Sequence, residues 1–336
     1  MELLWLFTVF LVPVTFVSPE SMSTGFVVPK VTLYRSLVGV ICALWIIEMG
    51  LARQREGGTV PMFNLAVVKR WLQGNPTRIL VVAAWALLGS DLISTLLSSS
   101  LSISLWGREP AQDGANFYNT ISHFVLFLVL ATHLKTTGQL WRIFGAVIAS
   151  GLLVGLYAVL QFYELDPFGI NLIGRRIVSS LGNPIFVGAF LLMLAPMTLS
   201  LTLGYPGTPN VSVRLILGTA VLTILVLGMA YTQSRGPWVG LAVALFVFLL
   251  LASMAAGWRA SLRALVMSVV AIGITWTIVT FVPSPSGAAK LSTRAFSVGS
   301  AVASSLSSEF PNGGRPSPFL SGFPESGATS GIPSSM

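Results

Sequence analysis

The chain has 336 residues, of which 54% are hydrophobic and only 9% are charged, and its mean hydropathy is +0.83. A water-soluble globule of this length needs more polar side chains to cover its surface. The formal net charge of +8 comes from basic residues that stand singly or in pairs, not from a basic stripe that could follow a phosphate backbone. Composition therefore predicts a lipid-solvated protein with no nucleic-acid partner. The single cysteine, Cys42, excludes a disulfide framework.

Nine apolar segments are long enough, or nearly so, to cross a hydrocarbon core about 30 Å thick. They predict an all-α fold, a polytopic transmembrane bundle of about nine helices. The segments are 1–17, 36–52, 79–97, 120–134, 140–162, 185–203, 213–231, 237–255 and 264–282. The first lacks the basic flank and cleavage site of a signal peptide, so we expect it to remain as a helix. Small residues such as Gly151 and Gly155 predict close helix packing.

The residues after Pro283 have a different composition. Segment 284–336 is rich in Ser, Gly and Pro and short of large aliphatic residues. It cannot bury enough apolar surface to offset the entropy lost on ordering. We therefore expect one transmembrane helical domain, 1–283, followed by a disordered tail.

The distribution of Lys and Arg predicts the orientation in the membrane. The loop 53–78 is the most basic, and basic loops remain in the cytoplasm. Alternation from that loop places the N-terminus inside and the tail outside. The basic residues expected on the outer side are Lys30, Arg35, Arg108, Arg175, Arg176 and Arg235.

Chemistry on the outer side must use a donor that is activated by its own linkage, such as a lipid diphosphate sugar, because no ATP is available there. Arginine is the preferred partner of a diphosphate, since its planar fork pairs with two phosphate oxygens. Arg235 is the sharpest candidate because Pro237 places it at a helix N-terminus, where free amides favour an anion. Arg175 and Arg176, before the sixth expected helix, are the second candidates.

Competing interpretations exist for these polar residues. Arg235 can reach lipid head groups or pair with Asp166 or Glu164. Asp91 lies well inside an expected span, where it either relays protons or, as we favour, is hydrogen-bonded to neighbouring helices. His123 and His133 lie near opposite ends of one expected helix, which is not a ligand spacing. We expect no metal and no cofactor.

Two stretches of the chain carry a resemblance. SRGPWVGLAVAL, residues 234–245, is similar to a Ser-Arg-Gly-aromatic-x-Gly signature, and GRRIVSSLGNPIFVGAFLLMLAP, residues 174–196, is similar to a segment in which an arginine precedes Gly-Asn-Pro and a helix that ends in Leu-x-Pro. Both features resemble the O-antigen ligase and O-antigen polymerase family. Their order and their separation of about fifty residues resemble the family pattern as well.

The resemblance implies a glycosyltransferase-type enzyme of the bacterial inner membrane. Such an enzyme transfers or polymerises a glycan from an undecaprenyl-diphosphate-linked donor, at the extracytoplasmic face, onto a lipid or glycan acceptor. Arg235 and one of Arg175 or Arg176 would hold the diphosphate and stabilise the charge that develops as it leaves. The motif residues that support this assignment are Ser234, Gly236 and Asn183.

The chain departs from the family after the ninth expected helix. Family members continue into a large external loop with a catalytic histidine, whereas residues 284–336 contain no histidine. The resemblance therefore supplies no catalytic residue, and we expect a donor-binding half of such an enzyme, as a truncated or frame-shifted reading frame would give.

Three alternative functions remain open. A transporter or flippase needs midplane polar groups, for which Asp91 is thin support. A structural membrane fragment without activity is the second alternative. A peptidoglycan polymerase of the shape and division type is expected to need an acid in an outer loop, where Asp113 and Asp166 lie.

Overall fold

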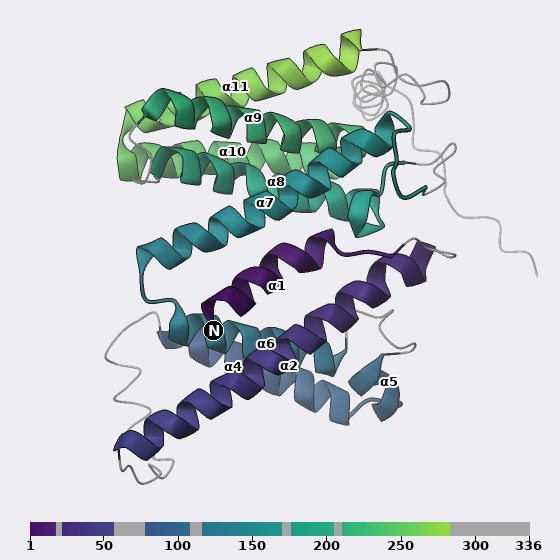
Figure 1. The fold of residues 1–336 in the computed structure, drawn as a ribbon, viewed down its shortest axis with the longest axis vertical. Helices are drawn as coiled ribbons and strands as arrows, with labels where there is room; N and C mark the ends of the chain where they lie inside the picture. The colour runs from purple at the N-terminus through teal and green to yellow at the C-terminus, as the bar shows by residue number, and fades with distance from the viewer. Residues whose placement is uncertain (18–21, 57–77, 108–115, 170–175, 205–209, 283–336) are drawn as a thin grey trace, which may run out of the picture. The chain divides into compact units, whose positions relative to one another are not determined.

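A computed structural model describes residues 1–17, 22–56, 78–107, 116–169, 176–204 and 210–282, which all belong to one unit, Met1–Ala289. The described elements are all helical, which confirms the predicted fold class (Figure 1). The expected tail, 284–336, lies outside the described residues. The helices are α1 (Glu2–Val14), α2 (Met22–Glu56), α4 (Arg78–Leu96), α5 (Leu101–Trp106), α6 (Phe117–His133), α7 (Thr137–Phe162), the 3₁₀ turn η1 (Ser179–Leu181), α8 (Pro184–Gly204), α9 (Val211–Tyr231), α10 (Arg235–Ala256) and α11 (Trp258–Phe281).

Each of the nine predicted segments corresponds to a helix. Among the described residues, seven helices are long and apolar enough to span a membrane, which makes the chain a multi-pass membrane protein, while α1 and α6 are shorter apolar helices. Lipid offers no hydrogen bonds, so a spanning segment must pair its backbone groups internally, as a helix does. The short helix α5 was not predicted, because its six residues are too few to form an apolar run of spanning length.

Polar residues set where several helices begin. Asn116 starts α6 by accepting a hydrogen bond from the Asn119 amide at 3.0 Å. Thr136 and Gln139 form a reciprocal capping box at the start of α7. Asn210 accepts from the first amides of α9. These caps satisfy donors that the helix itself leaves unpaired.

The structure corrects the start of the second predicted helix. α2 begins at Met22 and not at residue 36, so Lys30 and Arg35 lie inside a helix and not in an outer loop. Arg35 is accommodated because its Nε donates to Asn119 Oδ1 at 2.8 Å and its Nη2 donates to Asn116 Oδ1 at 3.0 Å. A charged residue is tolerated inside an apolar helix when other parts of the protein provide partners for it. A single sequence does not show those partners.

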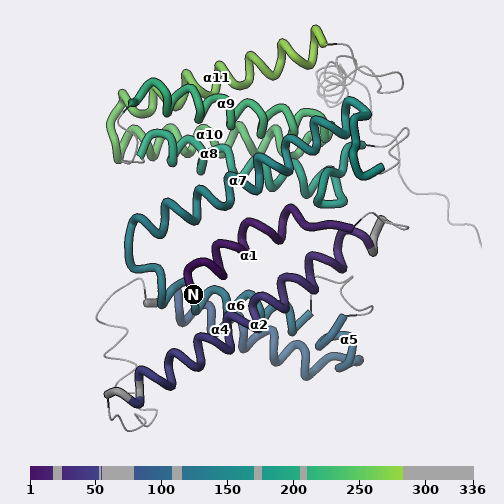
Figure 2. Tube along the Cα trace, viewed as in Figure 1, coloured from purple at the N-terminus to yellow at the C-terminus, as the bar shows by residue number. Residues whose placement is uncertain are grey.

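The helices pack as two groups that α1 connects. In the first group, α6 contacts α2, α4 and α5. In the second, α9 contacts α7, α8 and α11, and α10 contacts α8 and α11. α1 contacts α2 and α6 from the first group and α7 from the second, and the chain trace shows it running beside α7 (Figure 2). The second group carries both stretches that resemble the ligase and polymerase family.

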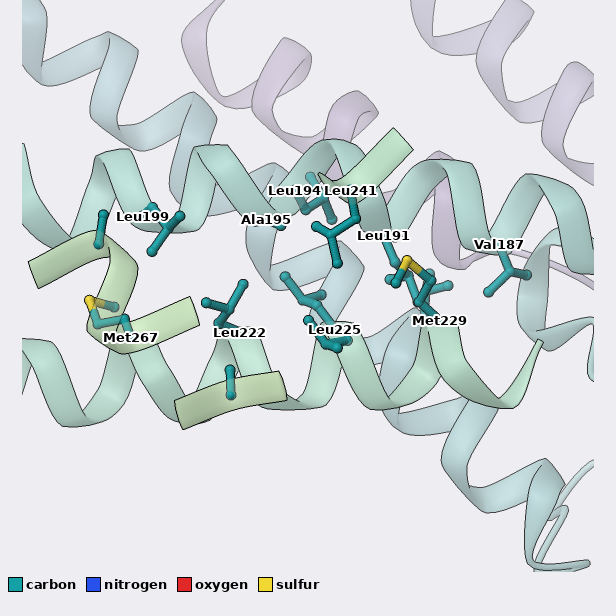
Figure 3. Close-up of a cluster of buried hydrophobic side chains, with 14 residues drawn as sticks. Val187, Leu191, Leu194, Ala195, Leu199, Leu222, Leu225, Met229, Leu241 and Met267 are labelled. Carbon is teal, nitrogen blue, oxygen red and sulfur yellow. The ribbon is translucent and has the colours of Figure 1, made fainter. Parts of the chain in front are cut away.

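The core of the second group is built from apolar side chains at helical spacing on α8 and α9. Leu191 and Leu194 of α8 meet Leu222, Leu225 and Met229 of α9, and all five are about 1% exposed (Figure 3). Side chains three or four residues apart share a helix face, so these positions form one continuous seam. The seam fixes α8 against α9, and therefore fixes the connections at their ends.

Glycines allow the helices of the second group to approach closely. A Cβ atom on Gly151 would lie 1.9 Å from a Leu194 methyl carbon, and one on Gly155 would lie 3.3 Å from the Ile224 carbonyl oxygen. The packing role that the sequence predicts for Gly151 and Gly155 is thereby confirmed. On the facing helix, a Cβ on Gly228 would lie 3.0 Å from the Cα of Gly155.

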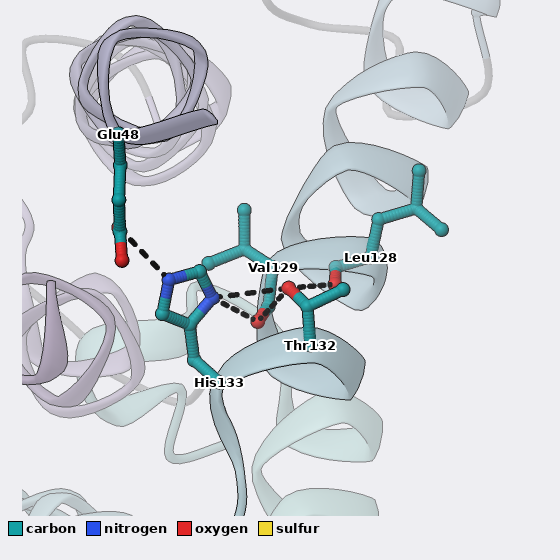
Figure 4. Close-up of polar contacts among 5 residues, drawn as sticks. All are labelled: Glu48, Leu128, Val129, Thr132 and His133. Carbon is teal, nitrogen blue, oxygen red and sulfur yellow. Dashed lines mark hydrogen bonds and ion pairs between the residues drawn. The ribbon is translucent and has the colours of Figure 1, made fainter. Parts of the chain in front are cut away.

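Successive helices run back and forth, so their ends gather at two sides (Figure 1). The first side, which we call the Glu2 end, holds the ion pair between Arg142 and Glu2. It also holds the contact between His133 Nε2 and Glu48 Oε2 at 3.1 Å, which joins α6 to α2 (Figure 4). The opposite side, the Arg176 end, contains residues 176–183 and the start of α10.

Replacing Gly228 by alanine should lower the stability of the α7–α9 contact. Alanine in a helix interior normally stabilises by about 1 kcal/mol relative to glycine, but overpacking against the Gly155 backbone costs about 1–3 kcal/mol. We expect Gly228→Ala to lower the apparent Tm of the detergent-solubilised protein. Gly273→Ala is the control, because a Cβ there meets nothing within 4 Å, and it should leave the Tm equal or higher. Equal Tm values for the two variants would contradict the close approach.

Candidate functional site

The residues that precede α8, which we call the 176–183 segment, are fixed by contacts with four other parts of the chain. The fully buried Ser179 donates its backbone N–H to Gln161 Oε1 at 2.7 Å and its Oγ hydrogen to the Val154 carbonyl at 2.7 Å. Ser179 also has a φ of +46°, a left-handed conformation that costs a non-glycine residue about 1–3 kcal/mol. The hydrogen bonds to α7 hold the segment in this conformation.

The N-terminal helices hold the next residue of the segment. Ser180 Oγ donates to the Pro13 carbonyl at 2.8 Å. Lys30 Nζ donates to the carbonyl oxygens of Ser180 and of Thr15, the residue that ends α1. A cation is favourable at a helix C-terminus, where unpaired carbonyl groups carry partial negative charge. Lys30 therefore joins α1, α2 and the 176–183 segment, and this explains how a lysine is retained inside an apolar helix.

The Gly-Asn-Pro stretch starts α8. Gly182 has a φ of +75°, and a Cβ on it would lie 2.6 Å from Phe26. Asn183 Oδ1 accepts from the Ile185 amide at 2.9 Å, as an N-cap residue does. Pro184 is the first helical residue, a position that needs no amide hydrogen. The structure thus places Asn183, a candidate motif residue, in a helix-capping role.

Arg176 connects the two stretches that resemble the ligase and polymerase family. Its Nε donates to the Thr232 carbonyl at 3.0 Å, and its Nη2 donates to Ser234 Oγ. Thr232 is fully buried and Ser234 is 4% exposed, so these acceptors have fixed positions. Arg175, the other predicted arginine of this segment, lies outside the described residues.

The turn from α9 to α10 has a defined conformation of its own. Gln233 has a φ of +53° and its amide donates to the Ala230 carbonyl at 3.0 Å. Thr232 Oγ1 donates to the Met229 carbonyl at 2.7 Å and accepts from the Ser234 amide at 3.3 Å. The turn therefore presents the residue that follows it, Arg235, at a fixed place.

Arg235 is the first residue of α10 and its side chain is exposed. It makes no hydrogen bond or ion pair with any residue of the described ranges. In particular, the pairing with Asp166 or Glu164 that the sequence left open is not formed. Asp166 Oδ1 instead accepts from the Tyr157 hydroxyl at 2.9 Å and from the Phe168 amide at 2.9 Å.

The start of α10 packs tightly on one side and is open on the other. A Cβ on Gly188 of α8 would lie 2.5 Å from Pro237 Cγ, so Pro237 fits against a glycine. A Cβ on Gly236, by contrast, would meet nothing within 4 Å. The N-cap residue Ser234 makes no side-chain cap hydrogen bond, and its hydroxyl instead accepts from Arg176. The first turn of α10 thus has the partial positive charge of a helix N-terminus and lies near two guanidinium groups, those of Arg176 and Arg235.

Aromatic residues stabilise the helix ends beside this turn. Phe162 stacks on Tyr231 with ring centroids 3.8 Å apart and planes 3° apart. The hydroxyl groups of Tyr163 and Tyr231 are 2.9 Å apart, within hydrogen-bonding distance. α7 and α9 are therefore joined next to Thr232, which adds rigidity to the turn.

Sequence reasoning missed the contribution of Lys30 and Ser179 to this end of the molecule. Apolar run length alone predicts a loop at Lys30, although the position of this lysine in the apolar run FVVPKVTL indicates a charge inside a helix. The role of Ser179 depends on its left-handed φ. Serine rarely adopts this conformation, so its presence in the sequence does not predict it.

No family model, no curated protein and no solved structure matches this chain. The resemblance to the O-antigen ligase and polymerase family therefore rests on the residues of the two stretches alone.

The hydrogen bond between Arg176 and Ser234 should be measurable as a coupling energy. We expect Arg176→Ala and Ser234→Ala to be non-additive by about 1–2 kcal/mol in the free energy of unfolding, because they remove the same bond. Arg176→Ala combined with Ser268→Ala is the control, since Ser268 donates to Ala264 within α11. That pair should be additive within about 0.5 kcal/mol. Additivity of the first pair as well would contradict the contact.

Proposed function

We propose that this multi-pass membrane protein binds an undecaprenyl-diphosphate-linked glycan donor at its Arg176 end. In this proposal it takes part in glycan ligation or polymerisation at the extracytoplasmic face of a bacterial inner membrane. One observation carries the proposal: Arg176 hydrogen-bonds to the turn that presents Arg235. Arg176 and Arg235, which are about sixty residues apart in the sequence, thereby contribute to one positively charged region.

The chemistry of the two arginines fits a diphosphate leaving group. Arg235 is free to pair with phosphate oxygens, because no described residue uses its guanidinium. Arg176 positions the turn and adds a second positive charge. A guanidinium remains protonated in proteins, so these residues bind the leaving group and stabilise its charge but do not remove a proton from the acceptor.

The surface next to Arg235 supports a lipid-linked ligand. Val239, Val243 and Phe246 follow Arg235 along one face of α10 and are 68%, 58% and 69% exposed. Residues spaced by three or four share a helix face, so an anion at Arg235 would have a continuous apolar strip beneath it. An isoprenoid chain of the donor would lie along this strip.

The proposal predicts that Arg235→Ala abolishes glycan formation. The measurement is complementation of cells that lack their own ligase or polymerase, with long glycan scored on a gel at matched membrane abundance. Loss of a group that stabilises the leaving charge should reduce product about 100-fold or more. Arg259→Ala is the matched control, because Arg259 is also an exposed arginine at a helix start, but at the Glu2 end.

Several outcomes would contradict this proposal. Glycan that persists in Arg235→Ala would remove the arginine from the donor site. Absence of glycan with the unmodified chain, at normal abundance, would favour a structural membrane fragment without activity. Equal loss in Arg235→Ala and Arg259→Ala would indicate a general effect of removing basic residues.

The proposal also requires the Arg176 end to face the outside of the cell. In a Cys42→Ala background, Gly236→Cys should react with a membrane-impermeant maleimide in intact cells, because Gly236 is exposed at that end. Lys135→Cys, exposed between α6 and α7 at the Glu2 end, should react only after the membrane is permeabilised. The reverse pattern would place the two arginines in the cytoplasm and would exclude an extracytoplasmic donor site.

A further inference from the structure

A polar cleft of about 740 Å³ lies among α4, α5 and α6, away from the 176–183 segment. Eight of the ten lining residues that the structure describes have polar side chains, six of them with hydroxyl groups, which is unusual for a surface between membrane helices. The lining residues are Asp91, Ser94, Thr95, Leu97, Ser98, Ser99, Ser104, Asn116, Phe117 and Thr120.

Asp91 provides the only charge among these lining residues. The sequence favoured a structural role in which this carboxylate is hydrogen-bonded to neighbouring helices. Within the described ranges, however, Asp91 makes no hydrogen bond or ion pair, and it lines the cleft instead. An acid inside a spanning helix is costly unless a ligand or water solvates it. Among the described lining residues the Asp91 carboxylate disfavours a phosphate group, while the guanidinium of Arg35, which reaches the wall of the cleft, is already hydrogen-bonded to Asn116 and Asn119.

The walls of the cleft are held in place by their own contacts. Ser104 Oγ donates to Ser98 Oγ at 2.6 Å, which joins α5 to the turn after α4. On the opposite wall, Asn116 Oδ1 accepts from Arg35 Nη2 at 3.0 Å. Polar groups that are fixed before a ligand binds lose little freedom on binding.

Apolar and aromatic surface adjoins the polar lining. Ile93, Leu96 and Leu97 at the end of α4 are 59%, 62% and 80% exposed. Trp106 of α5 packs edge-to-face on Tyr118 of α6 with ring centroids 5.6 Å apart, and Trp106 remains 58% exposed. A ligand with a polar head and an apolar tail matches this combination of surfaces, because an amphipathic ring and exposed aliphatic side chains suit the interface of a bilayer.

We propose that this cleft binds the neutral, hydroxyl-rich head group of a glycolipid, whose acyl chains lie along the end of α4. The Asp91 carboxylate accepts hydrogen bonds from sugar hydroxyls, and the Ser and Thr hydroxyls both donate and accept. The volume lies within the range of about 300–1,000 Å³ of small-molecule sites and is far larger than a bound ion needs. The inference goes beyond the proposed donor site, because the cleft shares none of its residues with that site.

The test is a binding measurement on the full chain, purified in a detergent without a sugar head group. Native mass spectrometry would compare retention of a monohexosyl diacylglycerol with retention of a diacylglycerol and a phosphatidylglycerol that carry the same acyl chains. We expect preferential retention of the monohexosyl lipid, and about tenfold weaker binding in Asp91→Asn, which loses charge-assisted hydrogen bonds. Glu48→Gln, which removes a carboxylate at the Glu2 end, should leave binding unchanged.

A second measurement locates the lipid without altering Asp91. In a Cys42→Ala background, Ser99→Cys at the exposed rim of the cleft should be protected from maleimide by the monohexosyl lipid and not by the diacylglycerol. Equal retention of all three lipids would overturn the proposal. So would preferential binding of phosphatidylglycerol, or a sodium-dependent stabilisation that Asp91→Asn abolishes while glycolipid binding persists, which would identify a cation site. None of these results depends on glycan transfer at Arg235.

Discussion

The constraint on which the structure depends is that lipid offers no hydrogen bonds to polar groups between helices. Several polar side chains at the Arg176 end satisfy this constraint with partners inside the protein. Lys30 meets this requirement through carbonyl groups at the end of α1 and in the 176–183 segment. Ser179 meets it through α7, and Arg176 meets it through the turn before α10. These contacts determine the positions of five helices relative to one short segment.

Helix packing and polar pairing act together on the two arginines. The leucine seam between α8 and α9 fixes the axes of these helices, and the contact of Pro237 with Gly188 fixes the start of α10 against α8. The bond from Arg176 to Ser234 then adds a short-range restraint across the same end. A larger residue at Gly188 would move α10, and with it Arg235, without touching either arginine. The geometry of this end is therefore a property of the packed helices and not of the loop sequences alone.

Hydrophobic run length was enough to predict the fold class and most helix boundaries. The segment predicted at 213–231 is α9, Val211–Tyr231, and the segment at 185–203 is α8, Pro184–Gly204. Apolar runs predict helices because backbone N–H and C=O groups in lipid must form hydrogen bonds within the segment itself. Run length failed for α2, where the partners of Lys30 and Arg35 come from distant parts of the chain. The sequence also identified Arg176 and Arg235 as candidates, but their connection through Thr232 and Ser234 required the three-dimensional structure.

α2 contacts both the 176–183 segment and the Asp91 cleft. Lys30 and Arg35 are five residues apart on it, about 7.5 Å along the helix axis. Lys30 contacts the 176–183 segment, and Arg35 contacts Asn116 in the lining of the Asp91 cleft. The two sites differ in their available charge: Arg235 has no partner among the described residues and favours an anion, whereas at the cleft the Arg35 guanidinium is bonded to Asn116 and Asn119 and the Asp91 carboxylate disfavours an anion. A diphosphate would therefore be favoured at Arg235, and a neutral sugar would find hydrogen-bond partners among the Ser and Thr hydroxyls of the cleft.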